Sequence, residues 1–286
     1  MRIKPANLLT FAILFALQTA CVRATDEIAG RDIAYAGTVP MTGFMRLDRT
    51  SDGRARIDAW EVHDGQVVRS YDIDMTKTMH AIVVSDDLSD FQHVHPVLSS
   101  DGHLSMELHL AEPHAAYHIY FDGLPHGLGR NVFQFDLPAQ AGAKTTTREV
   151  HAAGSSVSVG PYVVKIDPTS VPIGEIATIS VRILKNGRPA TDLHPYLGVI
   201  SHGVLVGTQD LAYLHVHGMT AAMLDMASDD CGDSMMMQTP PLPPNSIVPS
   251  EFELELLVPI SENYNLWLQF IGGKTVYTAP FLVTTK

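Results

Sequence analysis

After about its first 25 residues, the chain consists of short apolar runs separated by turn dipeptides, without long helical periodicity. Asp64-Gly65 lies between the runs 56–62 and 66–72, and Asn186-Gly187 follows the run 178–184. Such dipeptides favour two-residue turns between antiparallel strands. Other short runs rich in Val, Ile and aromatic residues cover 80–85, 117–121, 131–137, 202–207, 265–271 and 276–283. The pattern predicts an all-β protein built from antiparallel strands.

The second half of the chain repeats the first half at an offset of 122 residues. Over 32 positions without a gap, this offset aligns both turn dipeptides, the apolar pattern between them and three histidines in each copy. A tandem duplication predicts two domains of one fold. A unit of about 110 residues fits an antiparallel β-sandwich of the immunoglobulin-like or cupredoxin-like kind.

Composition sets the expected domain boundaries. Residues 139–156 are rich in Gly, Ala and Thr and lack apolar periodicity, so they predict a linker between a first sandwich at 31–138 and a second at 157–286. The copies differ in length, because 22 residues separate His95 from Tyr117 whereas 47 separate His217 from Tyr264. The extra 25 residues belong to a Met-rich insert at 219–244, expected to be an exposed loop, which holds six of the twelve Met.

The amino terminus resembles a secretory signal. Arg2 and Lys4 precede an apolar run at 8–17, and small residues follow it. This arrangement predicts a signal peptide at 1–24, removed after Ala24. Alternatively, Ala20-Cys21 fits a lipobox, which makes Cys21 a candidate for lipidation. Both interpretations predict export to the periplasm or cell envelope, with membrane contact only through a lipid anchor.

Composition favours a cation as the partner. The chain has 19 basic and 31 acidic residues, a net charge of −12, and no cluster of Lys or Arg, so nucleic-acid binding is not expected. It has 14 His and 12 Met but only two Cys. Neither His nor Met is needed in such numbers to build a core. With Cys21 in the predicted signal, Cys231 lacks a partner for an internal disulfide.

Each repeat carries a His-x-His pair whose side chains point the same way, because successive residues of a strand alternate between its faces. A third His, thirteen residues upstream, is brought alongside by an antiparallel return. Three imidazoles with an open position suit Cu(II) or Zn(II). The sequence therefore predicts a three-His site in each domain, with copper as the expected ion and zinc as the alternative. The candidate ligands are His80, His93 and His95 in the first domain and His202, His215 and His217 in the second.

The insert adds soft ligands, which select Cu(I). The candidates for soft-metal binding are Met223, Met226, Cys231, Met235, Met236 and Met237. The competing interpretation is a loop whose Met side chains pack on the second domain. His194 is a further metal candidate because it precedes His202 closely.

No catalytic constellation accompanies these residues. The chain lacks GxSxG, HExxH and CxxC motifs and a phosphate-binding glycine loop. The thiolate of a blue-copper carrier is missing from both copies. Three-His sites also occur in zinc hydratases, but no general acid or base beside either cluster can be named. We therefore expect a protein that is not an enzyme.

Two segments resemble a known family. The first, MHAIVVSDDL at 79–88, leads into FQHVHP at 91–96, and the second, DLHPYLG at 192–198, leads through His202 into LHVH at 214–217. They resemble bacterial exported proteins with tandem YtkA-like, immunoglobulin-like domains linked to heavy-metal and copper handling. The resemblance implies export, a β-sandwich and a connection to metals. Gly218 departs from the first copy, where Pro96 follows the His-x-His pair.

Together these patterns predict an exported metal-binding protein. It would sequester copper, or transfer it to another metal-handling protein of the envelope, through its two His-x-His sites. The alternative is a non-catalytic immunoglobulin-like interaction module of the cell envelope whose histidines are structural.

Overall fold

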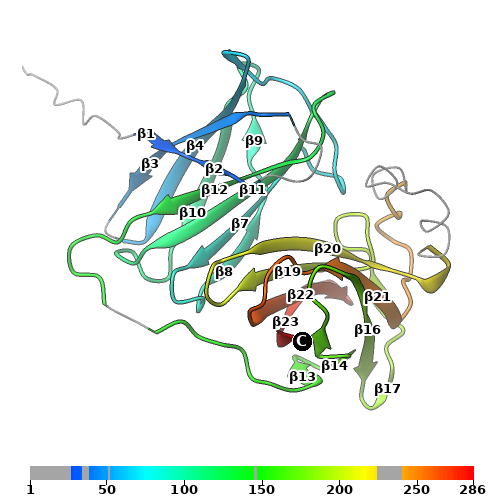
Figure 1. Ribbon diagram of the computed structural model, residues 1–286. Coiled ribbons are helices and arrows are strands. Elements are labelled where there is room, and N and C mark those ends of the chain that lie inside the picture. Colours follow the sequence, from blue (N-terminus) through cyan, green and yellow to red (C-terminus); the bar gives the residue numbers. More distant parts are fainter. Residues whose placement is uncertain (1–26, 34–38, 51, 145–146, 224–239) are drawn as a thin grey trace, which may run out of the picture.

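The computed structural model describes residues 27–33, 39–50, 52–144, 147–223 and 240–286. Its strands form two β-sandwiches, one at 27–137 and one at 156–285, which lie against each other in Figure 1. The predicted all-β sandwich fold is confirmed.

The first sandwich consists of two six-stranded antiparallel sheets. In one sheet, the strand order is β1 (Glu27–Ala29), β3 (Thr42–Arg49), β4 (Arg54–His63), β10 (Leu104–His109), β9 (Val97–Leu98). A short strand outside this order, β5 (Gln66–Val67), pairs with β4. In the other sheet, the strand order is β2 (Arg31–Asp32), β12 (Asn131–Leu137), β11 (Tyr117–Pro125), β7 (Met79–Ser85), β8 (Phe91–Val94). A short strand outside this order, β6 (Tyr71–Asp72), pairs with β11.

The second sandwich is one eleven-stranded sheet that closes over its own core. The order is β13 (Ser156–Val159), β14 (Tyr162–Asp167), β16 (Ile176–Lys185), β21 (Glu251–Leu257), β20 (Tyr213–Met219), β19 (His202–Gly207), β22 (Tyr264–Gly272), β23 (Thr275–Thr285), β15 (Ser170–Val171). Off this path, β17 (Arg188–Pro189) pairs with β16, and β18 (Leu193–His194) pairs with β22.

Both predicted turn dipeptides close hairpins. Asp64 and Gly65 have φ of 48° and 75°, and Asn186 and Gly187 have φ of 52° and 74°, as a type I′ turn requires. They join β4 to β5 and β16 to β17. The run 66–72, predicted as one strand, is two strands, because β5 pairs with β4 and β6 pairs with β11 in the opposite sheet.

Burial patterns along the strands show where each sandwich is covered. In β10 and β21, buried and less buried residues alternate, as expected for a sheet with one face toward solvent. Every residue of β7, β11 and β19 is buried. On β7, Ala81 and Val83 face the core of the first sandwich, whereas Ile82 and Val84 face a separate core shared with the second sandwich. The fully buried strands therefore lie between the two sandwiches.

The shared core has an approximate two-fold symmetry that follows from the repeat. Phe91 stacks on Trp267 of the second sandwich, with ring centroids 4.8 Å apart, and Tyr213 stacks on Tyr120 of the first at 4.6 Å. The repeat offset of 122 residues relates Phe91 to Tyr213. After the insert, the offset grows by the 25 extra residues and relates Tyr120 to Trp267. Each sandwich thus offers the other the same kind of surface, as in a symmetric dimer.

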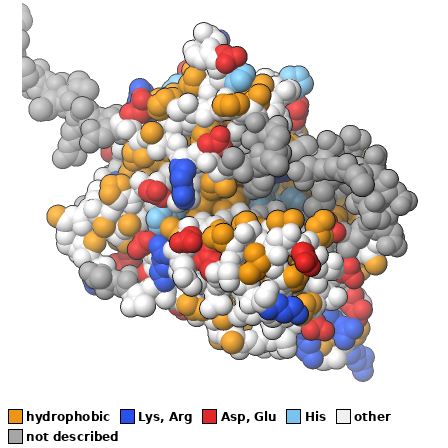
Figure 2. Space-filling model, viewed as in Figure 1, with side chains coloured by type: hydrophobic (Ala, Val, Ile, Leu, Met, Phe, Trp, Pro, Cys, Tyr) orange, Lys and Arg blue, Asp and Glu red, His pale blue; other side chains and the backbone are white. Residues whose placement is uncertain are grey.

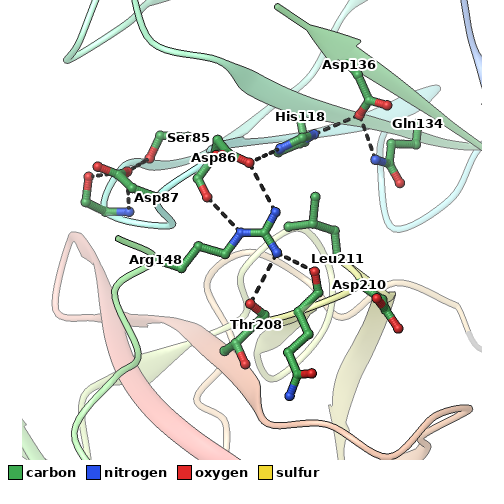
Figure 3. A network of polar contacts seen from close by, with 12 residues as sticks. Ser85, Asp86, Asp87, His118, Gln134, Asp136, Arg148, Thr208, Asp210 and Leu211 are labelled. Carbon is green, nitrogen blue, oxygen red and sulfur yellow. Dashed lines mark hydrogen bonds and ion pairs between the residues drawn. The ribbon is translucent and has the colours of Figure 1, made fainter. Parts of the chain in front are cut away.

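The segment between the sandwiches forms hydrogen bonds with both of them through Arg148 (Figure 3). Arg148 Nε donates to the backbone oxygen of Asp86 at 3.0 Å, and its terminal nitrogen donates to the backbone oxygen of Thr208 at 3.2 Å. Asp86 also accepts from His118 at 3.0 Å. One guanidinium therefore links the end of β7 to the end of β19.

Candidate metal centre

Six histidines, three from each sandwich, form one cluster where β7 and β8 meet β19 and β20; these are His80, His93, His95, His202, His215 and His217. Within a His-x-His pair, the ring centroids lie 4.9 Å apart for His93 and His95 and 4.8 Å apart for the equivalent pair. Between sandwiches, His80 lies 5.3 Å from His215, and His93 lies 5.4 Å from His202.

The arrangement within each sandwich follows the expected antiparallel return. In β19 and β20, His202 pairs directly with His217, and the β7–β8 register aligns Ala81 with Val94, one residue from His80 and His95. The arrangement between sandwiches differs from the expected separate site in each domain. Because the fully buried faces of β7 and β19 pack together, both sets of histidines lie in a single cluster.

Two groups within the cluster have the spacing of metal ligands. The ring nitrogens of His80, His93 and His215 lie within 4.8 Å of one another, and so do those of His202, His215 and His217. His215 belongs to both groups, and the first group combines residues from both sandwiches. Histidine side chains are visible at the junction of the two halves on the face drawn in Figure 2.

Hydrogen bonds on the outer side of the cluster determine which nitrogens carry hydrogen. His202 Nε2 lies 3.2 Å from the backbone oxygen of Tyr196, and His215 Nδ1 lies 3.2 Å from Oδ2 of Asp122. A carbonyl or carboxylate oxygen only accepts, so both nitrogens donate. In the neutral rings, His202 Nδ1 and His215 Nε2 then present lone pairs to each other across 2.9 Å.

The first sandwich repeats this arrangement. His80 Nε2 donates to the backbone oxygen of Asp74 at 3.1 Å, and His93 Nδ1 donates to Oε1 of Gln269 at 2.8 Å. His80 Nδ1 and His93 Nε2 are left facing each other at 3.0 Å. Four lone pairs from neutral rings therefore face one another in two pairs within the cluster, where a bound cation would satisfy them.

Asp122 supplies negative charge beside the cluster. Its carboxylate is 1% exposed and accepts from Arg130 at 2.5 Å, while Arg130 also donates to Asp74 at 2.6 Å. Burial alone would raise the pKa of Asp122, but the charge of Arg130 and the hydrogen bond from His215 hold it below its usual range. Asp122 therefore places a buried carboxylate charge directly beside the ring of His215.

Burial keeps the rings neutral. Desolvation, reinforced by repulsion from His215, lowers the pKa of His80 to about 4, and the pKa of His93 falls further for the same reasons. The pKa of His202 is also well below its ordinary value because of its burial. At neutral pH these nitrogens are therefore deprotonated, as metal coordination requires.

Two further nitrogens of the cluster are buried without a hydrogen-bond partner among the described residues, Nε2 of His95 and Nε2 of His217. These residues occupy equivalent positions in the two repeats. A buried donor or acceptor without a partner costs about 1–3 kcal/mol. The two atoms are related by the repeat, so their lack of a partner is a property of the repeated site.

Tight turns present the backbone oxygens that orient His80 and His202. Asp74 and Lys77 exchange two backbone hydrogen bonds, and so do Tyr196 and Val199 in the second copy. The two residues between them have positive φ in each copy. The turns are therefore repeated along with the histidines they orient.

The remaining histidine candidate, His194, lies outside the cluster and contacts the backbone oxygen of Ser246 at 3.0 Å. Among the soft-metal candidates, Met223 is described and partly buried. The other soft-metal candidates lie outside the described residues, as do the predicted signal peptide and the lipidation candidate: Met226, Cys231, Met235, Met236, Met237, residues 1–24 and Cys21.

The sequence analysis missed the partners of the histidines. Asp122 and Gln269 occupy equivalent positions once the insert is added to the repeat offset, and each orients a histidine of the other sandwich. That equivalence was available in the sequence. It carried no chemical signal, because an isolated Asp and an isolated Gln in apolar strands do not indicate contact with a distant His.

Part of the chain matches a known family model. Residues 156–286, from the start of β13 to the end of the chain, match a family model described as "Domain of unknown function (DUF8832)". No curated protein matches the chain. Within the part of the chain that the structure describes, no helix has the length and apolar character needed to cross a bilayer.

Proposed function

We propose that this protein is an exported metal-binding protein that holds one transition-metal ion in the six-histidine cluster between its two sandwiches. The observation that carries the proposal is the set of four lone pairs facing inward, with the outer nitrogens committed to carbonyl, amide and carboxylate oxygens. Ligating histidines in metal sites typically donate their second N–H to such acceptors.

Copper is the proposed ion and zinc the alternative. Neutral imidazole binds both, and Cu(II) binds more tightly than Zn(II) at a given nitrogen site. The two groups share His215, which favours one ion per chain, because its single inward nitrogen can bind only one ion. Sequestration, or delivery to another metal-handling protein of the envelope, is the proposed role.

A second candidate function is an envelope interaction module with structural histidines. The contacts between His80 and His93 and between His202 and His215 favour it if each pair shares a proton. Burial opposes this arrangement, because a proton would place a charge in each pair.

The test is metal content of residues 25–286, purified without chelator or affinity tag, measured by mass spectrometry and followed by competition titration with Cu(II) and Zn(II). We expect about one equivalent of ion in the native chain. His215→Ala should remove it, because this residue belongs to both groups. His103→Ala is the matched control, since His103 pairs with Asp58 away from the cluster.

A native chain that neither contains nor takes up copper or zinc contradicts the metal proposal. The interaction module is then favoured if His215→Ala lowers the melting temperature without any change in metal content. If the chain binds two equivalents of ion, and His93→Ala and His217→Ala each remove one of them independently, each domain has its own metal site, as the sequence predicted.

A further inference from the structure

A cavity lined by three methionines adjoins the histidine cluster. It has a volume of about 30 Å³, and its lining includes Met75, Met219, Met223 and His217. The other lining residues are apolar or glycine, including Ile200 and Leu242. His217 is therefore the one side chain of the lining, among the described residues, that carries a nitrogen ligand.

The three methionines come from two separate parts of the chain. Met75 belongs to the turn that orients His80, Met219 ends β20, and Met223 follows it. Met75 has a φ of 42°, in a turn position where Asn or Gly is the usual residue. Met75 therefore lies at the cavity although its backbone conformation is unfavourable. Such strained conformations are common at functional sites.

His217 connects the cavity to the cluster. It is 7% exposed, and its Nε2 has no hydrogen-bond partner among the described residues. Its ring lies 4.8 Å from both His202 and His215. A buried polar atom without a partner calls for an explanation, and a bound water or ion is one.

From this geometry we infer that the cavity is a second metal site, specific for copper(I), with the thioethers of Met75, Met219 and Met223 and the imidazole of His217 as ligands. Thioethers are soft, neutral ligands that select Cu(I) over the harder divalent ions. A monovalent ion with neutral ligands also suits an apolar cavity better than a dication does. The inference extends the proposed function to the reduced ion, and its test does not depend on the histidine cluster being filled.

The test is an anaerobic titration of residues 25–286 with Cu(I) against a colorimetric Cu(I) chelator, repeated with Ag(I) as a redox-inert probe. The triple variant Met75→Leu, Met219→Leu, Met223→Leu keeps similar side-chain volumes and removes the sulfur. We expect its Cu(I) and Ag(I) affinities to fall at least about tenfold, equivalent to about 1.4 kcal/mol. Its Zn(II) affinity and melting temperature should stay at native values.

The matched control is Met41→Leu, Met45→Leu, Met106→Leu, which removes three thioethers from the core of the first sandwich, away from the cavity. It should retain native Cu(I) affinity, and X-ray absorption of the Cu(I) protein should show sulfur neighbours. The inference is overturned if the first variant binds Cu(I) as the native chain does, or if only the control variant loses binding. Loss of Cu(I) binding in the first variant supports it even if the native chain fails to bind Zn(II) and Cu(II), a result that would contradict the proposed function alone.

Discussion

Asp122 acts on the cluster through His215. Its carboxylate accepts the Nδ1–H of that ring from the opposite sandwich and so directs the Nε2 lone pair inward. A negative acceptor also makes the imidazole more basic and a better ligand. The equivalent residue, Gln269, orients His93 without a charge. The two halves of the cluster are therefore alike in geometry but different in electrostatics.

Replacing Asp122 by Asn tests this role. A neutral acceptor polarises His215 less, so we expect metal affinity to fall about 10–100-fold. Competition titration with Zn(II) measures the change. Asp136→Asn is the control, because Asp136 contacts His118 and Gln134, away from the cluster, and should keep native affinity. Native affinity in the Asp122 variant would show that the carboxylate serves only to neutralise Arg130.

Glu61 gives a second prediction at the residue scale. It is 3% exposed, accepts from Tyr71 at 3.1 Å, and burial raises its pKa from 4.5 to about 8. Between those values the folded chain holds a proton that the unfolded chain releases, so this residue lowers stability as pH rises, by at most about 1.4 kcal/mol per pH unit. Glu61→Gln should remove that slope.

Urea unfolding from pH 4.5 to 8.5 measures the effect. The variant and native free energies of unfolding should be similar near pH 4.5, and the variant should be the more stable at pH 8.5. Parallel pH profiles for the two proteins would mean that Glu61 titrates normally in the folded state.

At the scale of elements, tight turns position the buried carbonyls. Gly198 has a φ of 84° in the turn that orients His202, and a Cβ there would lie 2.6 Å from Cβ of Pro241. Gly187 has a similar φ of 74°, with nothing within 4 Å of its added Cβ. Comparing alanine substitutions at the two glycines therefore distinguishes the cost of backbone strain from the cost of steric contact.

Gly187→Ala should therefore lower the free energy of unfolding by about 1 kcal/mol, from backbone strain alone. Gly198→Ala should lower it by about 2–4 kcal/mol, since the contact with Pro241 adds to the strain. Urea unfolding at constant pH gives both values. Equal losses would mean that the segment containing Pro241 moves aside freely.

At the scale of the whole molecule, the strands that are buried on both faces connect the two sandwiches through a shared core. Ile82 and Val83 are neighbours on β7, and both are fully buried, but Ile82 faces the core between the sandwiches and Val83 faces the core of the first. A core that spans the junction makes the two sandwiches depend on each other for stability.

Substituting each residue by Ala distinguishes the two cores. Both changes should destabilise the chain, Ile82→Ala by about 2–5 kcal/mol and Val83→Ala by a smaller amount. Only Ile82→Ala should weaken the coupling between sandwiches, so calorimetry should show two resolved transitions for it and one for Val83→Ala. Two transitions in both variants, or already in the native chain, would mean that the sandwiches unfold independently.

The sequence by itself determined the all-β class, the two Gly-containing hairpin turns and the common direction of each His-x-His pair. These features depend on local physics: the two-residue period of a strand and the positive φ that Asp-Gly and Asn-Gly accept. The repeat offset also placed His80 and His202 beside their pairs, because an antiparallel return is a short-range connection.

Only the tertiary structure decided that both sets of histidines meet in one cluster. The apolar runs of β7 and β19 look the same whether their second face is covered by the same domain or by another, and a sequence pattern does not name the covering surface. Packing of those faces brings Asp122 to His215 and Gln269 to His93, across sequence separations of 93 and 176 residues. The inward lone pairs, and the thioether cavity beside them, arise from that packing.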